Sequence, residues 1–422
     1  MKSSTSFKAL SGSNYFRLKI AYSLLLNQAI EITNIRDDDI NPGLSKYEIS
    51  FLKLISEITN GTVIDINKTG TTLKFTPGTI TNNYGDEFTF QCDKSRAVTY
   101  YAEGLIPIAM FGKESLVVNL EGITNNNIDN SVDSFKGSTC ALIQKLVVGD
   151  TVIFDIKKRG MFPNGCGCVK FKCPIITNLA PFDWVNEGKV KRVRGIAFTS
   201  KISSSFANRM VNKARGVLNN FLPDVWISTD SVKDKDLQKI SPGYGISLVA
   251  ETTNGFAFAS DMVNKDNKDH TPEDLAKELS VKFLNDIYCA GAVDVNNQGL
   301  FLFLMALSEK NLVSEMKIGR ITKYSKGVVR LIKQLLKVRF NIREVDEYDD
   351  NEEESEDDKK DEEEEEGEDK EGEDEEMENE DEEEEIGDGN DDDDEELPNV
   401  HEQYIYSCIG IGLRNVARIE LS

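Results

Sequence analysis

One order of predicted elements occurs three times along this chain: a helix, a strand, a second helix and a β-hairpin. The first copy has helices at 15–26 and 46–59, with a strand at 29–35 between them. Apolar residues in the second helix follow a 3.6-residue period. A hairpin follows, with strands at 62–67 and 72–76 and a turn at Thr69-Gly70. A repeated order of this kind predicts an internal structural repeat.

The second and third copies keep the order, although their residues differ. The second has helices at 95–110 and 133–147, a strand at 115–120, and hairpin strands at 151–156 and 169–173. The third has helices at 298–307 and 326–336, a strand at 315–318, and hairpin strands at 339–345 and 404–410. Three sheets with one amphipathic face each can share a core. We therefore expect an α+β fold of three repeated helix–strand–helix–hairpin units.

A segment of different character separates the second unit from the third. It has strands at 196–200, 224–229, 245–252 and 255–259, a helix at 204–220 and another that begins at Pro272. We interpret residues 183–284 as a small inserted α/β domain. The repeat body then covers 1–182, 285–345 and a final strand region at 399–422, and residues 346–398 interrupt the third hairpin.

That interruption is strongly acidic. Residues 346–396 contain 37 acidic and 3 basic residues, a net charge of −34, whereas the rest of the chain has 46 basic and 37 acidic residues, or +9. Such a run of like charges cannot bury enough apolar surface to fold, so we expect 346–398 to be disordered. It can mimic nucleic acid within the chain, shield the basic body or bind basic ribosomal proteins; a passive solubilising segment is the simplest interpretation.

Composition also indicates a compartment. The seven cysteines are scattered, the N-terminus shows no charged start followed by an apolar stretch, and the longest apolar run, 300–307, is too short to cross a bilayer. We expect a reduced, intracellular, soluble protein without a membrane partner.

Three basic clusters on a body of positive charge favour a polyanionic partner, RNA or a ribonucleoprotein. The first lies at the glycine-rich tip of the second hairpin, the second alternates along a strand of the inserted domain, and the third lies on the last helix. Each cluster alone suits a solvated face. The candidate binding residues are Lys157, Lys158, Arg159, Lys189, Lys191, Arg192, Arg194, Arg330 and Lys333.

Other patterns give no site. Cys166, Cys168 and Cys173 lack paired CxxC spacing and a nearby histidine, so we interpret them as reduced cysteines of a hairpin and not as zinc ligands. The run of aspartates at 37–39 is typical of a solvated turn. Neither a phosphate-binding GxxxxGK[ST] motif nor a Ser-His-Asp set can be assembled. We expect no metal and no cofactor.

Seven motifs together resemble the RNA 3′-terminal phosphate cyclase superfamily, and more closely its cyclase-like branch. They lie in order along the chain outside the acidic segment. They are Asn41-Pro42-Gly43-Leu44, Asn67-Lys68-Thr69-Gly70-Thr71-Thr72-Leu73, Arg159-Gly160-Met161-Phe162-Pro163-Asn164-Gly165, Arg194-Gly195-Ile196-Ala197, Ser241-Pro242-Gly243-Tyr244-Gly245, Ala250-Glu251-Thr252-Thr253 and Val293-Asp294-Val295-Asn296-Asn297-Gln298. The resemblance implies three α+β units and one inserted domain.

The resemblance also implies where a cyclase would carry its nucleophile. Cyclases form an adenylate on a histidine before the last repeat's helix, and that position is Tyr324 here. Tyrosine, with a pKa near 10, is a poor reversible adenylate carrier. Neither histidine, His270 or His401, fits the motif, and the N-terminal loop 11–17 is bulkier than the glycine-rich cyclase loop. We predict that cyclase activity is lost.

For the cyclase-like branch, the resemblance implies a nucleolar scaffold of the small-subunit processome. Such a protein binds a nucleolar GTPase, associates with pre-rRNA or the pre-ribosomal particle, and is needed for maturation of the small-subunit (18S) rRNA. The alternative, also suggested by the branch, is an endoribonuclease that cuts pre-rRNA near the 5′ boundary of the small-subunit rRNA. Arg330 and Lys333 beside Tyr324 would then stabilise charge on the cleaved phosphate.

Overall fold

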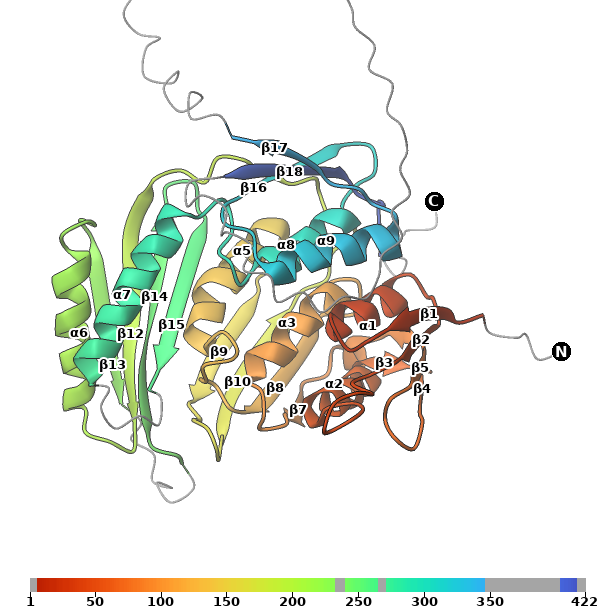
Figure 1. Cartoon of the computed structure of the whole chain (residues 1–422), viewed down its shortest axis with the longest axis horizontal. Coiled ribbons are helices and arrows are strands. Elements are labelled where there is room, and N and C mark those ends of the chain that lie inside the picture. Colours follow the sequence, from red (N-terminus) through yellow and green to blue (C-terminus); the bar gives the residue numbers. More distant parts are fainter. Residues whose placement is uncertain (1–5, 232–239, 265–270, 346–402, 416–422) are drawn as a thin grey trace, which may run out of the picture.

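The computed structural model describes residues 6–231, 240–264, 271–345 and 403–415. Helices and four-stranded sheets are mixed throughout (Figure 1), so the prediction of a mixed helix-and-sheet fold is confirmed. The predicted disordered segment 346–398, His270 and His401 lie outside the described residues.

Three of the sheets have the same strand order and the same directions. In each, the second strand pairs in parallel with the first and antiparallel with one hairpin strand, which pairs antiparallel with the other. The spatial orders are β1-β2-β5-β4, β7-β8-β10-β9 and β11-β16-β18-β17. Their bounds are β1 Lys8–Ser11, β2 Ile30–Thr33, β4 Val63–Ile66, β5 Leu73–Thr76, β7 Phe88–Gln91, β8 Leu116–Gly122, β9 Ile153–Lys158, β10 Gly167–Cys173, β11 Asp183–Trp184, β16 Val313–Ile318, β17 Asn341–Glu344 and β18 Tyr404–Ile409.

Two helical segments accompany each of these sheets. They are α1 (Phe16–Leu25) and α2 (Lys46–Ile58); α3 (Val98–Ala109) and a composite of α4 (Val132–Ser134), a π-helical turn (Phe135–Thr139) and α5 (Cys140–Leu146); and α8 (Gln298–Leu307) and α9 (Lys323–Leu336). The composite replaces the single helix predicted at 133–147. In Figure 1 the third sheet lies above α8 and α9, and the second lies behind α3.

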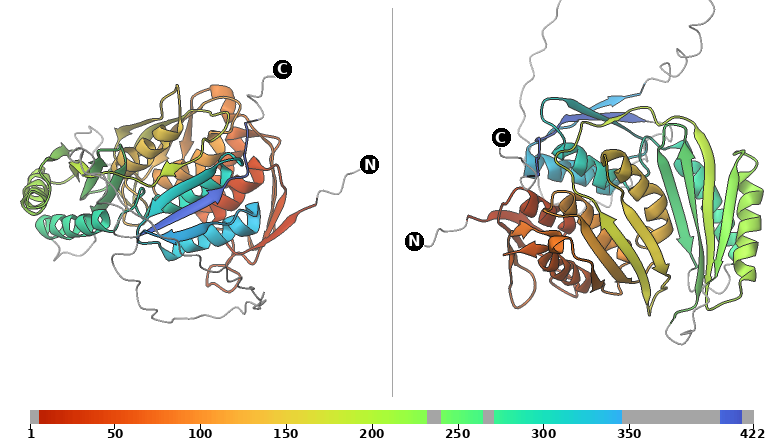
Figure 2. Two further views of the ribbon diagram at one scale, coloured as in Figure 1. Left: turned by 90° about the horizontal axis from the view of Figure 1, so that it is seen from above. Right: turned by 180° about the vertical axis from the view of Figure 1, so that it is seen from behind.

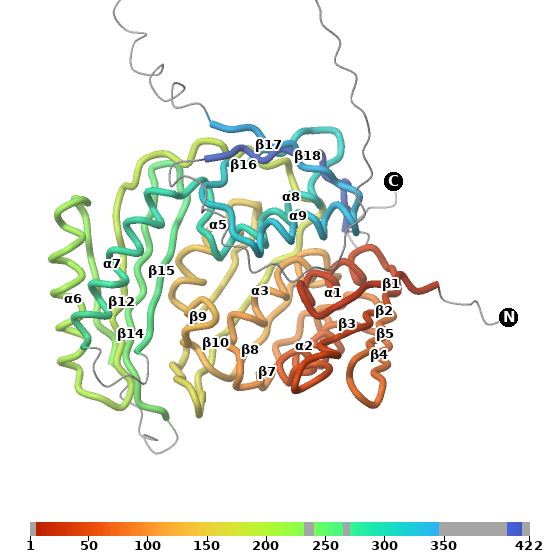
Figure 3. Tube along the Cα trace, viewed as in Figure 1, coloured from red at the N-terminus to blue at the C-terminus, as the bar shows by residue number. Residues whose placement is uncertain are grey.

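The first strand of each of these sheets was not predicted. β1 and β7 have four residues and β11 has two, too few to show a clear alternation of apolar and polar side chains. Figure 3 shows β1 and β7 beside the other strands of the first and second sheets. Asp183 and Trp184, which we had placed in the inserted segment, pair with Glu315 and Met316 of β16.

A fourth sheet lies at one side of the molecule, in the order β13-β12-β14-β15. Helices α6 and α7 cover one of its faces (Figure 2). The other face meets the π-helical turn and α4, where the Oγ atoms of Ser134 and Ser247 are 2.9 Å apart. The bounds are β12 Val190–Ser200, α6 Ser205–Leu218, β13 Val225–Ser231, β14 Gly243–Thr252, β15 Ala257–Val263 and α7 Pro272–Tyr288. The remaining described elements are a two-stranded ribbon, formed by β3 (Thr59–Asn60) and β6 (Thr79–Ile80), and a 3₁₀ turn (Asn82–Gly85).

Helix α8 lies at the centre of the core, since all ten of its residues are buried. The Phe301 ring packs against Trp184 of β11 at 5.1 Å between centroids, and Cys408 of β18 lies against its C-terminal turn. Asn297, which precedes it, accepts a hydrogen bond of 2.7 Å from Thr139 of the second unit. Helix α8 therefore joins parts of the chain that are far apart in sequence. Of the described helices, none has the length and apolar character that a bilayer span requires.

Two of the sequence motifs contact each other at the rim of the first sheet. The backbone amide of Leu44 donates to the carbonyl of Gly70 at 3.0 Å, so the loop after β2 docks on the β4–β5 turn. Gly43 has φ +89°, and a Cβ built on it would lie 2.4 Å from the carbonyl oxygen of Thr69. Only glycine fits both the dihedral angle and the space.

We predict that Gly43→Ala lowers the free energy of unfolding by roughly 1–3 kcal/mol, because backbone must move to admit the methyl group. Gly216→Ala is the matched control: Gly216 lies in α6 with nothing within 4 Å of a built Cβ. It should leave stability unchanged or raise it by up to about 1 kcal/mol. Urea denaturation of the two variants measures both, and equal effects would contradict the close approach at Gly43.

Asp261 of β15 lies where the fourth sheet meets the body. Its Oδ1 accepts a hydrogen bond of 3.2 Å from the backbone amide of Ser131. Burial raises the pKa of Asp261 to about 6, although the hydrogen bond from Ser134 and the charge of Lys282 act in the opposite direction. The folded protein therefore binds a proton at Asp261 more tightly than an unfolded chain does.

Asp261 should contribute a loss of stability as pH rises from about 4 to about 6, since its carboxyl ionises in the folded state at a higher pH than in the unfolded chain. Asp261→Asn removes this loss. We expect the variant to be more stable than wild type at pH 7 by roughly 1 kcal/mol or more, and to have no advantage below pH 4. Urea denaturation across pH 3.5–7.5 checks the sign, and a constant difference would contradict it.

Candidate functional site

The first predicted basic cluster is divided between surface and interior. Lys157 is exposed at the end of β9 and donates to Asn119 Oδ1 at 3.2 Å, and Lys158 is half-buried. Arg159 lies inside the fold, with a side chain only 5% exposed. Its Nη1 and Nη2 donate to the two oxygens of Asp133 at 2.6 and 2.9 Å, and its Nε donates to Asp230 at 2.6 Å.

Arg159 therefore joins the second hairpin to α4 and to β13 of the fourth sheet. Burial alone would lower its pKa, but the hydrogen bonds and charge of Asp133 and Asp230 raise that pKa overall. Its guanidinium stays ionised and committed to these carboxylates. The structure thus places Arg159 among the internal contacts and not on a binding surface.

The second cluster, on β12, is partly neutralised. Lys189 and Lys191 are exposed. Arg192 pairs with Glu251 of β14 at 2.6 Å, and Arg194 pairs with Asp224 at 2.8 Å. A β-bulge between residues 190 and 192 interrupts the regular alternation of side chains along β12.

The third cluster is larger than predicted. Arg330 and Lys333 lie on an exposed face of α9 with Lys323 and Lys326, at intervals of three and four residues that align side chains along a helix. Lys337, also exposed, is the left-handed C-cap residue directly after the helix. α9 itself contains no acidic residue. We call this set the α9 cationic face; its members are Lys323, Lys326, Arg330, Lys333 and Lys337.

No ion pair between described residues involves the α9 cationic face. The opposite face of α9 is apolar and packs on the core through Val328, Leu331, Ile332 and Leu335. The helix begins where the Thr322 hydroxyl accepts a hydrogen bond of 3.0 Å from the amide of Ser325. Strong amphipathicity therefore holds all five cations toward solvent.

Tyr324, at the position that the resemblance assigns to a nucleophile, lies in the first turn of α9. It is 45% exposed and packs on Tyr15 with 5.1 Å between ring centroids. Gly299 and Gly327 leave room for these rings: a Cβ on Gly299 would be 2.7 Å from Tyr324, and one on Gly327 would be 1.6 Å from the Tyr15 hydroxyl. Desolvation raises the pKa of Tyr324 above 10, although nearby Arg17 opposes this, so the phenol stays protonated at neutral pH.

A cavity of about 260 Å³ opens beside Tyr324, between α1, α3, the 128–130 loop and the start of α9. Two arginines line it. Its lining residues are Arg17, Arg96, Thr99, Tyr100, Glu103, Ile128, Asp129, Asn130, Phe135, Val295, Asn296, Thr322 and Tyr324.

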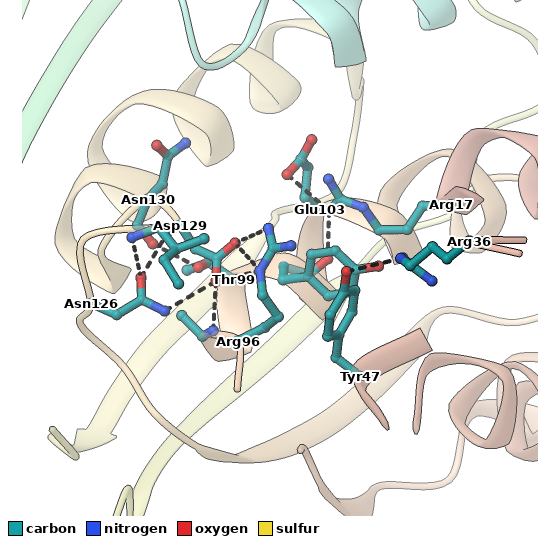
Figure 4. Close-up of polar contacts among 12 residues, drawn as sticks. Arg17, Arg36, Tyr47, Arg96, Thr99, Glu103, Asn126, Asp129 and Asn130 are labelled. Atoms are coloured by element: carbon teal, nitrogen blue, oxygen red, sulfur yellow. Dashed lines mark hydrogen bonds and ion pairs between the residues drawn. The ribbon is translucent and has the colours of Figure 1, made fainter. Parts of the chain in front are cut away.

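Each lining arginine pairs with one carboxylate (Figure 4) and lies over the Tyr100 ring. Arg17 donates to Glu103 at 2.9 Å and to the Tyr100 carbonyl at 2.6 Å. The Arg96 Nε lies 2.8 and 3.0 Å from the two oxygens of Asp129. Both guanidinium carbons lie over Tyr100, at 4.2 and 4.3 Å from the ring centroid.

Further contacts fix these groups. Asp129 also accepts from the amide of Ala97 at 2.7 Å and from Asn126 at 3.1 Å. On the far side of Tyr47, Arg36 is bidentate to Glu48 at 2.6 and 2.8 Å, and Figure 4 shows its guanidinium directed to the Tyr47 hydroxyl. The arginines are thus preoriented but already paired, which leaves the cavity close to neutral.

Sequence reasoning missed Arg17, Arg36 and Arg96, because isolated arginines in unrelated segments give no spacing signal. The only indication was that Arg17 ends the N-terminal loop compared with the cyclases. Within the described part of the chain, no group of three or more His, Cys, Asp or Glu side chains is placed to hold a metal. Cys166 is exposed and Cys173 is buried, and residues 37–39 are exposed.

Comparison with known proteins agrees with the motifs. The sequence model of the RNA 3′-terminal phosphate cyclase family matches residues 8–342. A probable RNA 3′-terminal phosphate cyclase-like protein of Dictyostelium discoideum is 40% identical over 78% of this chain and 92% of its own length. The RNA 3′-terminal phosphate cyclase-like protein of Homo sapiens is 38% identical over 78% and 88%. The rRNA processing protein rcl1 of Schizosaccharomyces pombe is 36% identical over 80% and 93%.

Arg159→Met should lower the free energy of unfolding by about 3–5 kcal/mol, because it leaves Asp133 buried without its cation. Arg194→Met, which removes the exposed pair with Asp224, is the matched control and should change stability little. Urea denaturation gives both values.

The double variant Arg159→Met/Asp133→Asn tests the cause. If the loss comes from an uncompensated carboxylate, the double variant regains part of it relative to Arg159→Met alone. A double variant as unstable as the sum of the single changes would contradict this account.

Proposed function

The chain belongs to the RNA 3′-terminal phosphate cyclase family, and from that premise we propose that it is a non-cyclase rRNA-processing factor that binds pre-rRNA phosphates through the α9 cationic face. Five exposed cations without an acidic residue on the same helix are the observation that carries the proposal. Contacts of this type bind any phosphodiester backbone and depend strongly on salt, without reading the bases.

The relatives support the processing role. One of them, 36% identical and matched over 93% of its length, is named an rRNA processing protein. In finer detail, we propose that the protein acts as a scaffold bound to a nucleolar GTPase of the small-subunit processome, in maturation of the small-subunit (18S) rRNA, and that it is located in the nucleolus. We also interpret the three sheets of like topology as copies of one unit, and 183–284 as an inserted domain.

The cavity beside Tyr324 favours a scaffold over a cyclase. A cyclase needs a nitrogen nucleophile that can accept and release AMP near neutral pH. The residue in that place is a phenol whose pKa is raised by desolvation, and the cavity lining contains no histidine among the described residues.

The alternative is the endoribonuclease, in which Arg330 and Lys333 would stabilise charge on a cleaved phosphate of pre-rRNA near the 5′ boundary of the small-subunit rRNA. Both side chains are exposed on the helix whose first turn contains Tyr324. A general base within reach would also be required, and Tyr324 is too weakly acidic to serve at neutral pH.

Lys326→Ala/Arg330→Ala/Lys333→Ala should weaken binding of a pre-rRNA fragment that spans this boundary by roughly tenfold or more at low salt. The slope of log affinity against log salt should become shallower by about 2, since each lost phosphate contact removes roughly 0.7 for single strands. The matched control, Lys53→Ala/Lys213→Ala/Lys277→Ala, removes the same charge from exposed positions on three other helices.

Fluorescence anisotropy across a salt series measures binding, and a gel of the same RNA after incubation detects cleavage. Equal losses in the two triple variants would contradict a specific role for α9. Site-specific cutting by wild type that disappears in the α9 variant would replace the scaffold with the endoribonuclease.

A further inference from the structure

Most of the described arginines contact a carboxylate. They are Arg17, Arg36, Arg96, Arg159, Arg192, Arg194, Arg209 and Arg343. The α9 cationic face is different, because none of its five members has an ion pair to a described residue. It is therefore a continuous set of positive charge without an ion pair to a described residue.

A strongly negative segment follows the α9 cationic face in the sequence. Helix α9 ends at Leu336, β17 begins at Asn341, and the acidic run starts directly after β17. The amide of Val345 donates to the carbonyl of Gln403 at 3.0 Å, so the described residues that flank 346–402 are joined to each other beside the third sheet. Residues 346–396 hold 37 acidic and 3 basic residues and lie beyond the part of the chain that the family model matches.

We propose that the acidic segment binds the α9 cationic face of its own chain and competes there with RNA. The occupant is thus residues 346–396, and the contact is between Asp or Glu carboxylates and the ammonium and guanidinium groups of α9. The proposal rests on the proposed function only for the competing ligand, because the contact within the chain requires no RNA.

Distance does not prevent the contact. The 14 residues of α9 form a helix about 21 Å long. Ten residues of fully extended chain span up to about 33 Å, so a small part of the acidic segment is long enough to follow the whole face. Because the segment is tethered one strand away from α9, its effective concentration at this face is in the millimolar range.

The proposed contact depends on many ion pairs, each of which is weak. Single exposed pairs contribute little, and salt screens them over about 8–10 Å. The attractions between many carboxylates and the five cations add together, as the attractions of many phosphates do when a nucleic acid binds. The segment carries far more negative charge than the five cations can neutralise. Only a ligand with a dense array of phosphates then displaces it, so the segment raises the selectivity of α9 for long RNA over short oligonucleotides and free nucleotides.

Zero-length carbodiimide crosslinking of the full chain tests the contact without RNA. Amide bonds between lysines of α9 and carboxyl groups of 346–396 should dominate the intramolecular crosslinks at about 50 mM salt, and should fall several-fold at about 500 mM. The control sites are the exposed Lys53, Lys213 and Lys277. Crosslinks spread evenly over control and α9 lysines would overturn the proposal.

Competition is tested by replacing 346–396 with a short Gly/Ser linker. The deletion should tighten RNA binding about tenfold at low salt in the wild-type background. In the Lys326→Ala/Arg330→Ala/Lys333→Ala background it should tighten binding much less. An equal gain in both backgrounds would mean repulsion by net charge alone and would overturn competition at α9.

The two proposals fail in different ways. If wild type and deletion variant both bind RNA no better than the α9 variant, the proposed RNA-binding function is wrong, while the crosslinks still decide whether the acidic segment occupies α9. If RNA binds through α9 and the crosslinks avoid it, the occupant is wrong and the function stands.

Discussion

Complete burial of α8 is the constraint on which the other elements depend. A helix that is apolar on all sides must be covered on all sides, and this one has no exposed residue. Strands β11 and β18, the π-helical turn and α9 each supply part of the cover. The apolar stripe of α9 packs on the core and contacts α8, which leaves the opposite face of the helix exposed. The sequence places cations and no acidic residue on that exposed face.

Periodicity predicted the parts of the fold that have enough length to show a period. The helix at 298–307 was predicted with the bounds found, and the strands of all three hairpins were located to within a few residues. The leading strands β1, β7 and β11 were missed because a two- to four-residue strand has no measurable alternation, and its pairing in parallel depends on a distant partner. Spacing found Arg330 and Lys333 but could not show that Arg159 is enclosed by Asp133 and Asp230, which lie 26 and 71 residues away. Nor could it bring together Arg17, Arg96 and Tyr100, because tertiary packing alone makes them neighbours.

The cavity and the α9 face differ in how their charges are compensated. In the cavity, Glu103 and Asp129 hold the two arginines in fixed positions and offset their charge. On α9 the cations have no such partners among the described residues and keep their full attraction for anions. An enzyme gains from preoriented groups aimed at one reacting atom, whereas a scaffold gains from a broad field that holds a long polyanion. Here the cavity holds preoriented groups, and the α9 cationic face supplies a broad field.

The hydrogen bond between Val345 and Gln403 has a consequence for how this chain can change over evolutionary time. The two strands that complete the third sheet, β17 and β18, pair with each other although a long stretch of chain connects them. The entropy lost when such an excursion is closed grows only with the logarithm of its length, about 0.6 kcal/mol for each doubling. Codons can therefore be gained or lost between β17 and β18 with almost no penalty to the fold. The position tolerates insertions, so acidic residues can be added or lost there while the sheet stays the same.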